Sequence, residues 1–318
     1  MNKLNTHLSK LLPIYITCAA LFSFVVPQIF SPIYHWTSFL LGFVIFLTGL
    51  SMSFKDLYIL KKSALIIGVG LTLKWTLTVI VSIVLAKIFF SAQPNLLAGL
   101  ILTGSVPSGT AATMYTFLAG GSTSLVVAMG ITDVFISPIL TPMIMNMAAN
   151  YSVVVSFLNL SIKMFFIVIL PIVLGMLLRH FGEGYISRGW PYAKLLSSFT
   201  LILIVLSVVA GITEQVTIQS SELILLVVIV FIQVFLPMVA GFGIARLLGF
   251  RREDSIAILF EVGLCNSALA AILALEFFGD ESALPAVINM IINLSLGAYF
   301  STLFSRKIKE KSKNLRNF

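Results

Sequence analysis

Three ionisable residues stand inside long apolar runs, where charge is unusual. Lys74 lies in GLTLKWTLTV, Asp133 in GITDVFI and Glu261 in LFEVGLCNSALA. A charged group at hydrophobic depth is costly, so it usually faces a partner or a wet cavity and marks a path for ions or solutes. The ammonium and the two carboxyl groups are therefore expected to compensate one another's charge and to mark a transport path for an ion or a solute.

The composition of the chain explains where these residues must lie. Of the 318 residues, 59% are hydrophobic and only 10% are charged, and the mean hydropathy is +1.07. A soluble domain carries about 25% charged residues, so lipid must cover much of this surface. Strands of a membrane barrel would show short alternating segments, which the sequence lacks. We expect an all-α polytopic membrane protein.

Ten apolar segments are long enough to form spans, since a spanning helix needs roughly 20 apolar residues. They cover roughly 11–31, 35–53, 63–90, 96–118, 123–148, 153–178, 192–212, 222–248, 254–278 and 283–305. The first segment has no cleavage signal after it, so we expect it to be retained.

The basic residues predict the orientation. With the N-terminus in the cytoplasm, all of the 20 Lys and Arg residues except Lys74, Lys87 and Lys163 fall in inner loops or in the tail 306–318. The positive-inside rule therefore places both termini, and this basic tail, in the cytoplasm. The net charge of +8 is a topology signal, and we expect no nucleic-acid partner.

Two of the ten segments predict broken helices. The fourth contains GSVPSGTAATM, in which Gly104, Pro107 and Gly109 open the hydrogen-bond ladder, and the ninth contains FEVGLCNSALA. A single such break is most simply a kink, because Pro and Gly are common in membrane helices. Two polar breaks at matched places in two sets of five favour a transport site between inverted repeats.

Five motifs, in this order and spacing, resemble the bile acid:sodium symporter family over nearly the whole chain. They are LTGLSMSFKDL, GLILTGSVPSGTAATMYTFLAGG, SPILTP, LPIVLGMLLR and FEVGLCNSALA. The resemblance implies one membrane-embedded transporter domain, 1–318, with ten helices in two inverted five-helix repeats at about 11–148 and 153–305. It implies a panel of spans 1, 2, 6 and 7 and a core of spans 3–5 and 8–10. In that core the discontinuous helices 4 and 9 cross.

The family binds two sodium ions behind this crossing, and the chain departs from both sites. At the first site, Ala112 and Thr113 replace polar residues, and Val126 and Gly130 replace hydroxyl residues. Glu261, which serves both sites in the family, is kept. A hard cation needs oxygen ligands, which methyl groups and hydrogen do not supply. The resemblance therefore predicts degenerate sodium sites and no bound metal.

The second sodium site has Lys74 in place of one glutamine and Cys265 in place of another. We hypothesise that the Lys74 ammonium takes the place of this sodium and pairs with Glu261. Val126, Gly130, Asp133 and Ser137 share one helical face, so Asp133 is a second candidate partner. The predicted ion-coupling residues are Lys74, Asp133, Glu261, Val262, Leu264 and Cys265. Proton coupling, uniport and exchange stay open, as does a lysine that merely snorkels.

The resemblance also implies a substrate cleft beside the crossing. Its expected residues are Ser108, Gly109, Thr110, Thr113, Asn266, Ser267, Asn293 and Ser295. Half-helix N-termini carry partial positive charge and free amides, which suit an anion. For the last two residues, bonding between helices is an equal alternative. We infer a small carboxylate, carried by alternating access in a secondary-active or facilitative manner. The alternative is a sodium-coupled symporter of bile acids or similar organic anions.

Other classes of protein fit the sequence less well. An intramembrane aspartyl protease needs two deep aspartates, and Asp133 is the single one; His7, His35 and His180 lie at helix ends or in loops. Nothing resembles the selectivity-filter ring of a channel. We therefore expect no enzyme, no cofactor and no protein partner. The expected location is a bacterial inner membrane, with several spans.

Overall fold

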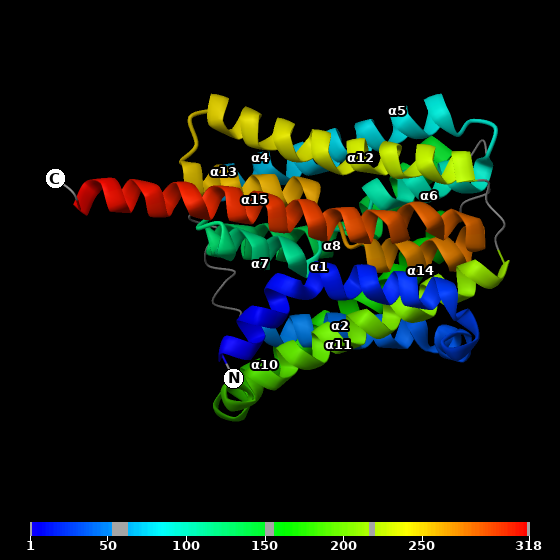
Figure 1. Ribbon diagram of the computed structural model, residues 1–318, viewed down its shortest axis with the longest axis horizontal. Coiled ribbons are helices and arrows are strands. Elements are labelled where there is room, and N and C mark those ends of the chain that lie inside the picture. Colours follow the sequence, from blue (N-terminus) through cyan, green and yellow to red (C-terminus); the bar gives the residue numbers. More distant parts are fainter. Residues whose placement is uncertain (1, 53–62, 150–155, 216–219, 317–318) are drawn as a thin grey trace.

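The computed structural model describes residues 2–52, 63–149, 156–215 and 220–316. Most of its helices run roughly along the long axis, and both chain ends lie at the same end of the bundle, on the left in Figure 1. Within the described residues, extended pairing is confined to an isolated antiparallel bridge between Ser108 and Cys265. The expectation of an all-helical protein is confirmed for this part of the chain.

The first half of the chain forms the following elements. They are α1 (Asn2–Val25), the 3-10 turns η1 (Pro27–Ile29) and η2 (Ser31–Trp36), α2 (Thr37–Ser51), α4 (Ala64–Leu73), the π-turn η4 (Lys74–Thr78), α5 (Val79–Phe89), α6 (Pro94–Gly104), α7 (Thr110–Leu118) and α8 (Thr123–Ala149).

The second half of the chain is also helical. Its elements are α9 (Phe157–Met164), the π-turn η5 (Phe165–Ile169), α10 (Leu170–Phe181), α11 (Glu183–Gln215), α12 (Ser220–Leu247), α13 (Arg252–Gly263), α14 (Ser267–Phe278), the 3-10 turn η6 (Asp280–Ala283) and α15 (Leu284–Arg316).

Seven described helical segments are long and apolar enough to cross a membrane. They are Ser31–Leu50, Ala64–Phe89, Thr123–Ala149, Phe157–Phe181, Leu195–Thr213, Ser221–Leu247 and Asp280–Ser305. Three shorter apolar helices accompany them: Ile14–Val25, Pro94–Gly104 and Ser267–Phe278. The seven overlap expected spans 2, 3, 5, 6, 7, 8 and 10, so the protein is a polytopic membrane protein. An 11-residue helix covers about 17 Å, roughly half of the hydrocarbon core, which is why α6 and α14 do not span it alone.

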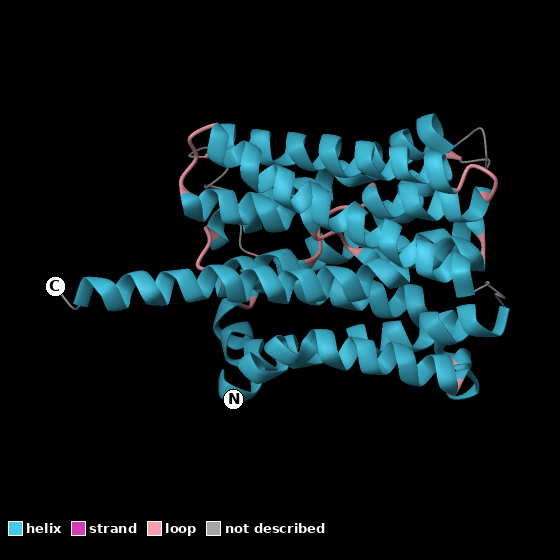
Figure 2. Ribbon diagram, turned by 45° about the horizontal axis from the view of Figure 1, so that its top comes forward, coloured by secondary structure: helices cyan, strands magenta, loops and turns pink. Residues whose placement is uncertain are grey.

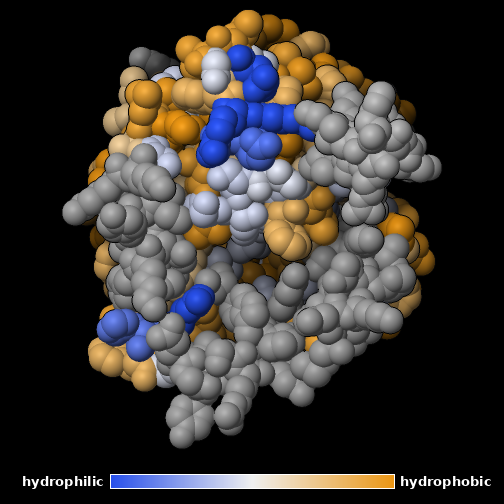
Figure 3. Space-filling model, turned by 90° about the vertical axis from the view of Figure 1, so that its left-hand side faces the viewer, coloured by the Kyte–Doolittle hydropathy of each residue, from blue (hydrophilic) through white to orange (hydrophobic). Residues whose placement is uncertain are grey.

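The helices form two groups, visible in Figures 1 and 2. The panel, as we use the word here, consists of α1, α2, α9, α10 and α11, and the core consists of α4–α8 and α12–α15. Within the panel α2 packs closely on α10, because a Cβ atom on Gly49 or Gly175 would overlap the opposing backbone. Figure 3 shows apolar flanks, with hydrophilic residues gathered on the end face. This distribution suits a bundle surrounded by lipid.

Candidate functional site

Two interrupted helices meet in the middle of the core. The break between α6 and α7 faces the break between α13 and α14, and the two extended segments pair as antiparallel strands. The Gly109 amide donates to the Leu264 carbonyl at 2.9 Å, and the Asn266 amide donates to the Pro107 carbonyl at 2.8 Å. Irregular backbone at membrane depth needs such partners. Both helix breaks predicted from the sequence are therefore present, and we call this pairing the crossing.

Lys74 begins the π-turn between α4 and α5 and reaches the crossing. Its side chain is 2% exposed. The Nζ atom lies 2.6 Å from Asp133 Oδ2 and donates to the Val106 carbonyl at 2.8 Å. It also lies 4.4 Å from the centre of the Trp75 ring. A π-turn shifts the following residues around the helix axis and is common at functional sites. Because the Lys74 side chain is buried and its ammonium is paired with Asp133, the alternative of a snorkelling lysine is wrong.

Asp133, from α8, is the centre of this polar group. Besides Lys74, its carboxylate accepts hydrogen bonds from Trp75 Nε1 at 2.7 Å and from the Ser108 amide at 2.6 Å. The side chain is fully buried. A buried ion pair offsets its desolvation only with good geometry and further hydrogen bonds, and this pair has both. It ties α8 and the π-turn η4 to the crossing.

Glu261 is bonded differently from the expectation. Its Oε1 atom accepts from the Ser108 hydroxyl at 2.8 Å, whereas Oε2 is buried without a hydrogen-bond partner among the described residues. The expected Lys74–Glu261 ion pair is corrected: Lys74 pairs with Asp133, the candidate second partner. The physical reason is that Asp133 and the Val106 carbonyl already engage the ammonium. Ser108 bridges the two carboxyl groups, through its amide to Asp133 and through its hydroxyl to Glu261.

Cys265 joins a second polar group, between α14 and α15. The thiol donates to Asn289 Oδ1 at 3.1 Å, and the Ser267 hydroxyl donates to the same oxygen at 2.7 Å. Asn293 Nδ2 donates to Ser267 Oγ at 2.9 Å and to the Cys265 carbonyl at 3.1 Å. These bonds fasten the crossing to α15. Sequence reasoning missed Asn289, although its spacing of four from Asn293 puts both on one face of a helix.

The other predicted residues fall into three places. The Val262 carbonyl accepts from Thr78 Oγ1 at 2.8 Å, so it is bonded to the π-turn, while the Leu264 carbonyl is used in the crossing. Ser295 is exposed, and its hydroxyl donates to the Ile291 carbonyl of its own helix at 2.8 Å. Thr110 is exposed and Thr113 half-buried, both in α7.

The crossing therefore has a buried side and an accessible side. Lys74, Asp133 and Glu261 are buried. The remaining predicted substrate residues at the breaks, apart from buried Ser267, are half-buried or exposed: Ser108, Gly109, Thr110, Thr113 and Asn266. The N-terminus of α7 has no side-chain cap, whereas the Asn266 side chain accepts from the Leu269 amide and caps α14. Uncapped first-turn amides can bind an anion.

Two observations bear on whether a cation could bind beside Glu261. A Cβ atom on Gly130 would lie 3.7 Å from Ser108 Oγ, so the α8 face that contains Asp133 and Gly130 faces the crossing. On that face Gly130 has no side-chain oxygen that could bind a cation, and the nearby Asp133 carboxylate is already paired with the Lys74 ammonium. Among the described residues, no group forms a hydrogen bond with Glu261 Oε2, which is buried.

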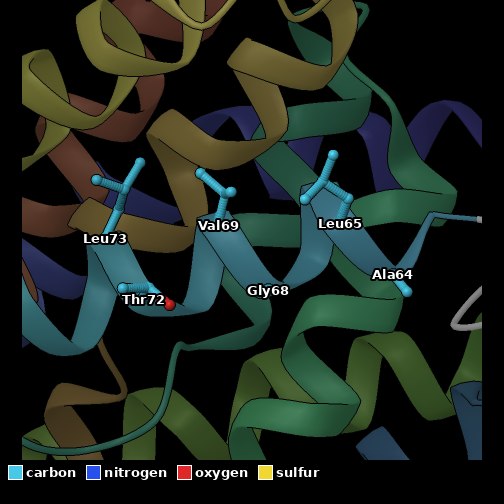
Figure 4. Close-up of a pocket in the computed structure, with 6 residues that line it drawn as sticks. All are labelled: Ala64, Leu65, Gly68, Val69, Thr72 and Leu73. Atoms are coloured by element: carbon cyan, nitrogen blue, oxygen red, sulfur yellow. The ribbon is translucent and has the colours of Figure 1, made fainter.

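A separate groove runs along α4, shown in Figure 4. Its volume is about 560 Å³, it is open to the surface, and it is lined by Ala64, Leu65, Gly68, Val69, Thr72 and Leu73. All six residues come from one helix, and five of them are apolar. No predicted site residue lines this groove, so the candidate site is the crossing and not the groove.

Comparisons with known proteins identify relatives of this chain. A model of the Sodium Bile acid symporter family matches residues 38–220. The chain is 29% identical over 311 residues to the uncharacterized sodium-dependent transporter YocS of Bacillus subtilis, covering 98% of this chain and 96% of the relative. It is 24% identical over 300 residues to the probable sodium/metabolite cotransporter BASS1, chloroplastic, of Arabidopsis thaliana, covering 94% and 74%. It is 25% identical over 170 residues to the sodium/bile acid cotransporter 7 of Rattus norvegicus, covering 52% and 50%.

Proposed function

Because this chain belongs to the sodium bile acid symporter family, and is therefore a membrane transporter and not an enzyme, we propose that it carries a small organic anion by alternating access without sodium. The observation that carries this proposal is the buried Lys74 ammonium. It is bonded to Asp133 and to the Val106 carbonyl at the crossing. The protein thus contains its own cation at the position where the resemblance expects a sodium ligand.

Both the available ligands and the local charge disfavour a sodium ion at this site. Lys74 already uses one carboxylate and one backbone carbonyl that a cation would need. A second cation placed beside it would meet a fixed positive charge in a medium of low dielectric constant, where repulsion is strong. The residues Ala112, Val126 and Gly130 add no oxygen ligands from their side chains.

The accessible side of the crossing supports an anionic substrate. The uncapped α7 N-terminus offers amides and partial positive charge, and Thr110, Thr113 and Asn266 add polar side chains nearby. A carboxylate needs such donors and no metal. Asn293 is bonded within the α14–α15 group, so we place it as a support of the substrate site. That Ser295 lines the substrate cleft stays a prediction.

Alternating access also requires a particular arrangement of spans, which we include in the proposal. We propose ten spans, in which α6–α7 and α13–α14 form the fourth and ninth, within one domain of two inverted repeats at about 11–148 and 153–305. The matched breaks and the seven long helices support this count. We also propose that both termini and the basic tail 306–318 face the cytoplasm from a bacterial inner membrane, as the basic residues predict.

Sodium-coupled symport is the second candidate, and two observations favour it. The printed names of all three relatives above describe sodium-dependent or sodium-coupled transport. In addition, Glu261 Oε2 is a buried oxygen with no partner among the described residues. In that case the substrate would be a bile acid or a similar organic anion.

Ligand binding to the purified protein separates the two candidates. The probes are C3–C6 hydroxy- and keto-carboxylates, with taurocholate as the bile-acid probe, in sodium chloride or in choline chloride. We expect the affinity for a small carboxylate to be equal in the two salts. A tenfold or larger loss of affinity without sodium would overturn sodium independence. The variant Lys74→Gln is not expected to create a sodium requirement, because the other ligands are still missing, and Lys87→Gln, exposed on the same span, is the matched control.

A further inference from the structure

We propose that Lys163, Glu276, Tyr34 and Asp280 form a latch that holds the panel and the core together at one end of the bundle. The latch rests on the alternating-access function proposed above and adds the contacts that set the balance between its two states. It consists of one ion pair and one hydrogen bond, and each joins a panel residue to a core residue.

The ion pair of the latch joins two spans that the sequence places far apart. Lys163 Nζ, in the last turn of α9, lies 2.5 Å from Glu276 Oε1, near the end of α14. The two side chains are 33% and 38% exposed. Both residues lie in apolar segments, where a charge usually has a partner. Two further ion pairs, Lys74–Asp133 and Arg251–Asp254, lie within the core.

The hydrogen bond of the latch has the same arrangement. The Tyr34 hydroxyl, from the turn η2 of the panel, donates to Asp280 Oδ1, in the turn η6 of the core, at 3.1 Å. The Tyr34 ring packs directly against Gly211 of α11, where a Cβ atom would overlap it. This contact holds the Tyr34 ring on the panel. The Tyr34–Asp280 hydrogen bond can therefore form only when the core lies close to the panel at this end.

Both contacts lie at the same end of the molecule. The turn η6 directly follows α14, and the turn η2 joins α1 to α2. In Figure 1 these segments lie at the end opposite to the two chain termini. Under the proposed orientation this is the outer end. The structure therefore has the panel and the core joined by polar contacts on the outer side.

The physical chemistry of a partly exposed ion pair suits a contact that must open and close. When the interface is closed, Lys163 and Glu276 satisfy each other among apolar neighbours. When water enters an opened interface, both charges can be hydrated, so the cost of separation stays small. Such a contact biases a two-state element without locking it.

The experiment measures the distance between panel and core at this end, without substrate. Nitroxide labels are placed on Ile29→Cys of η1 and Ala92→Cys of the α5–α6 connection, both exposed, in a chain carrying Cys18→Ser and Cys265→Ser. We expect Lys163→Gln and Glu276→Gln each to raise the ratio of long to short distances by about fivefold, the upper range for a partly exposed ion pair. The double variant Lys163→Glu/Glu276→Lys should restore the original ratio.

Matched controls make the outcome decisive. Arg251→Gln removes an ion pair within the core and should leave the distances unchanged. Elution as a single peak in size-exclusion chromatography shows that each variant is folded. Unchanged distances in both single variants, or a charge-exchanged variant that stays open, would overturn the latch. Carboxylate transport by the chain with its native cysteines tests the proposed function separately: absence of transport there would refute that function, whatever the distances show.

Discussion

Removal of the Lys74 charge is the perturbation that tests the central observation. In Lys74→Met the chain length is nearly kept, but Asp133 loses its ammonium while it stays fully buried. Breaking a buried ion pair by removing one partner costs about 3–5 kcal/mol. Asp133 keeps two donors, from Trp75 and Ser108, so we expect about 3 kcal/mol, the lower end of that range.

The assay is a double-mutant cycle on thermal unfolding in detergent. Soluble domains of 150–250 residues lose about 2–4 °C of Tm per kcal/mol, which gives a decrease of roughly 6–12 °C for Lys74→Met. Asp133→Asn should cause a similar decrease, because the ammonium then keeps one carbonyl partner. The double variant buries no charge at this place. Its loss should therefore be smaller than the sum of the single losses by about 1–3 kcal/mol.

The control for this cycle is Lys87→Met, the same substitution at an exposed position of the same span, which should change Tm by less than about 2 °C. The reasoning is refuted if Lys74→Met unfolds at the Tm of the parent chain. It is equally refuted by strict additivity in the double variant, since that would mean that the two residues do not interact.

Three further substitutions test the crossing and the helix packing around it. Ser108→Ala should lower stability by about 1–3 kcal/mol, because a buried carboxyl group loses its hydrogen bond; an unchanged Tm would contradict this. Gly99→Ala should prevent folding, since its Cβ would overlap the backbone of η6, whereas Gly68→Ala meets no atom within 4 Å and should fold normally, as protein yield will show. Thr110→Glu should weaken carboxylate binding at least about tenfold by like-charge repulsion, and Thr110→Ser should retain it.

The sequence predicted a large part of the fold for a simple reason. Apolar runs of membrane length form helices in lipid, because their backbone groups have no other partners. The helix breaks were also predictable, since Gly104, Pro107 and Gly109 remove or weaken hydrogen bonds locally. The face of α8 that contains Asp133 followed from helical periodicity. The expectation that a deep lysine needs a partner followed from the cost of placing a charge at hydrophobic depth.

The choice of partner was decided by the tertiary structure. Asp133 and Glu261 are both buried near Lys74, and sequence spacing does not rank two carboxyl groups on different helices. The packing of α8 against α6 and α13 brings Asp133 to the ammonium and leaves Glu261 with Ser108. Likewise, Glu276 looked like part of an apolar segment until the fold placed it against Lys163. Local patterns fix which groups must be compensated, whereas only three-dimensional packing fixes which groups compensate them.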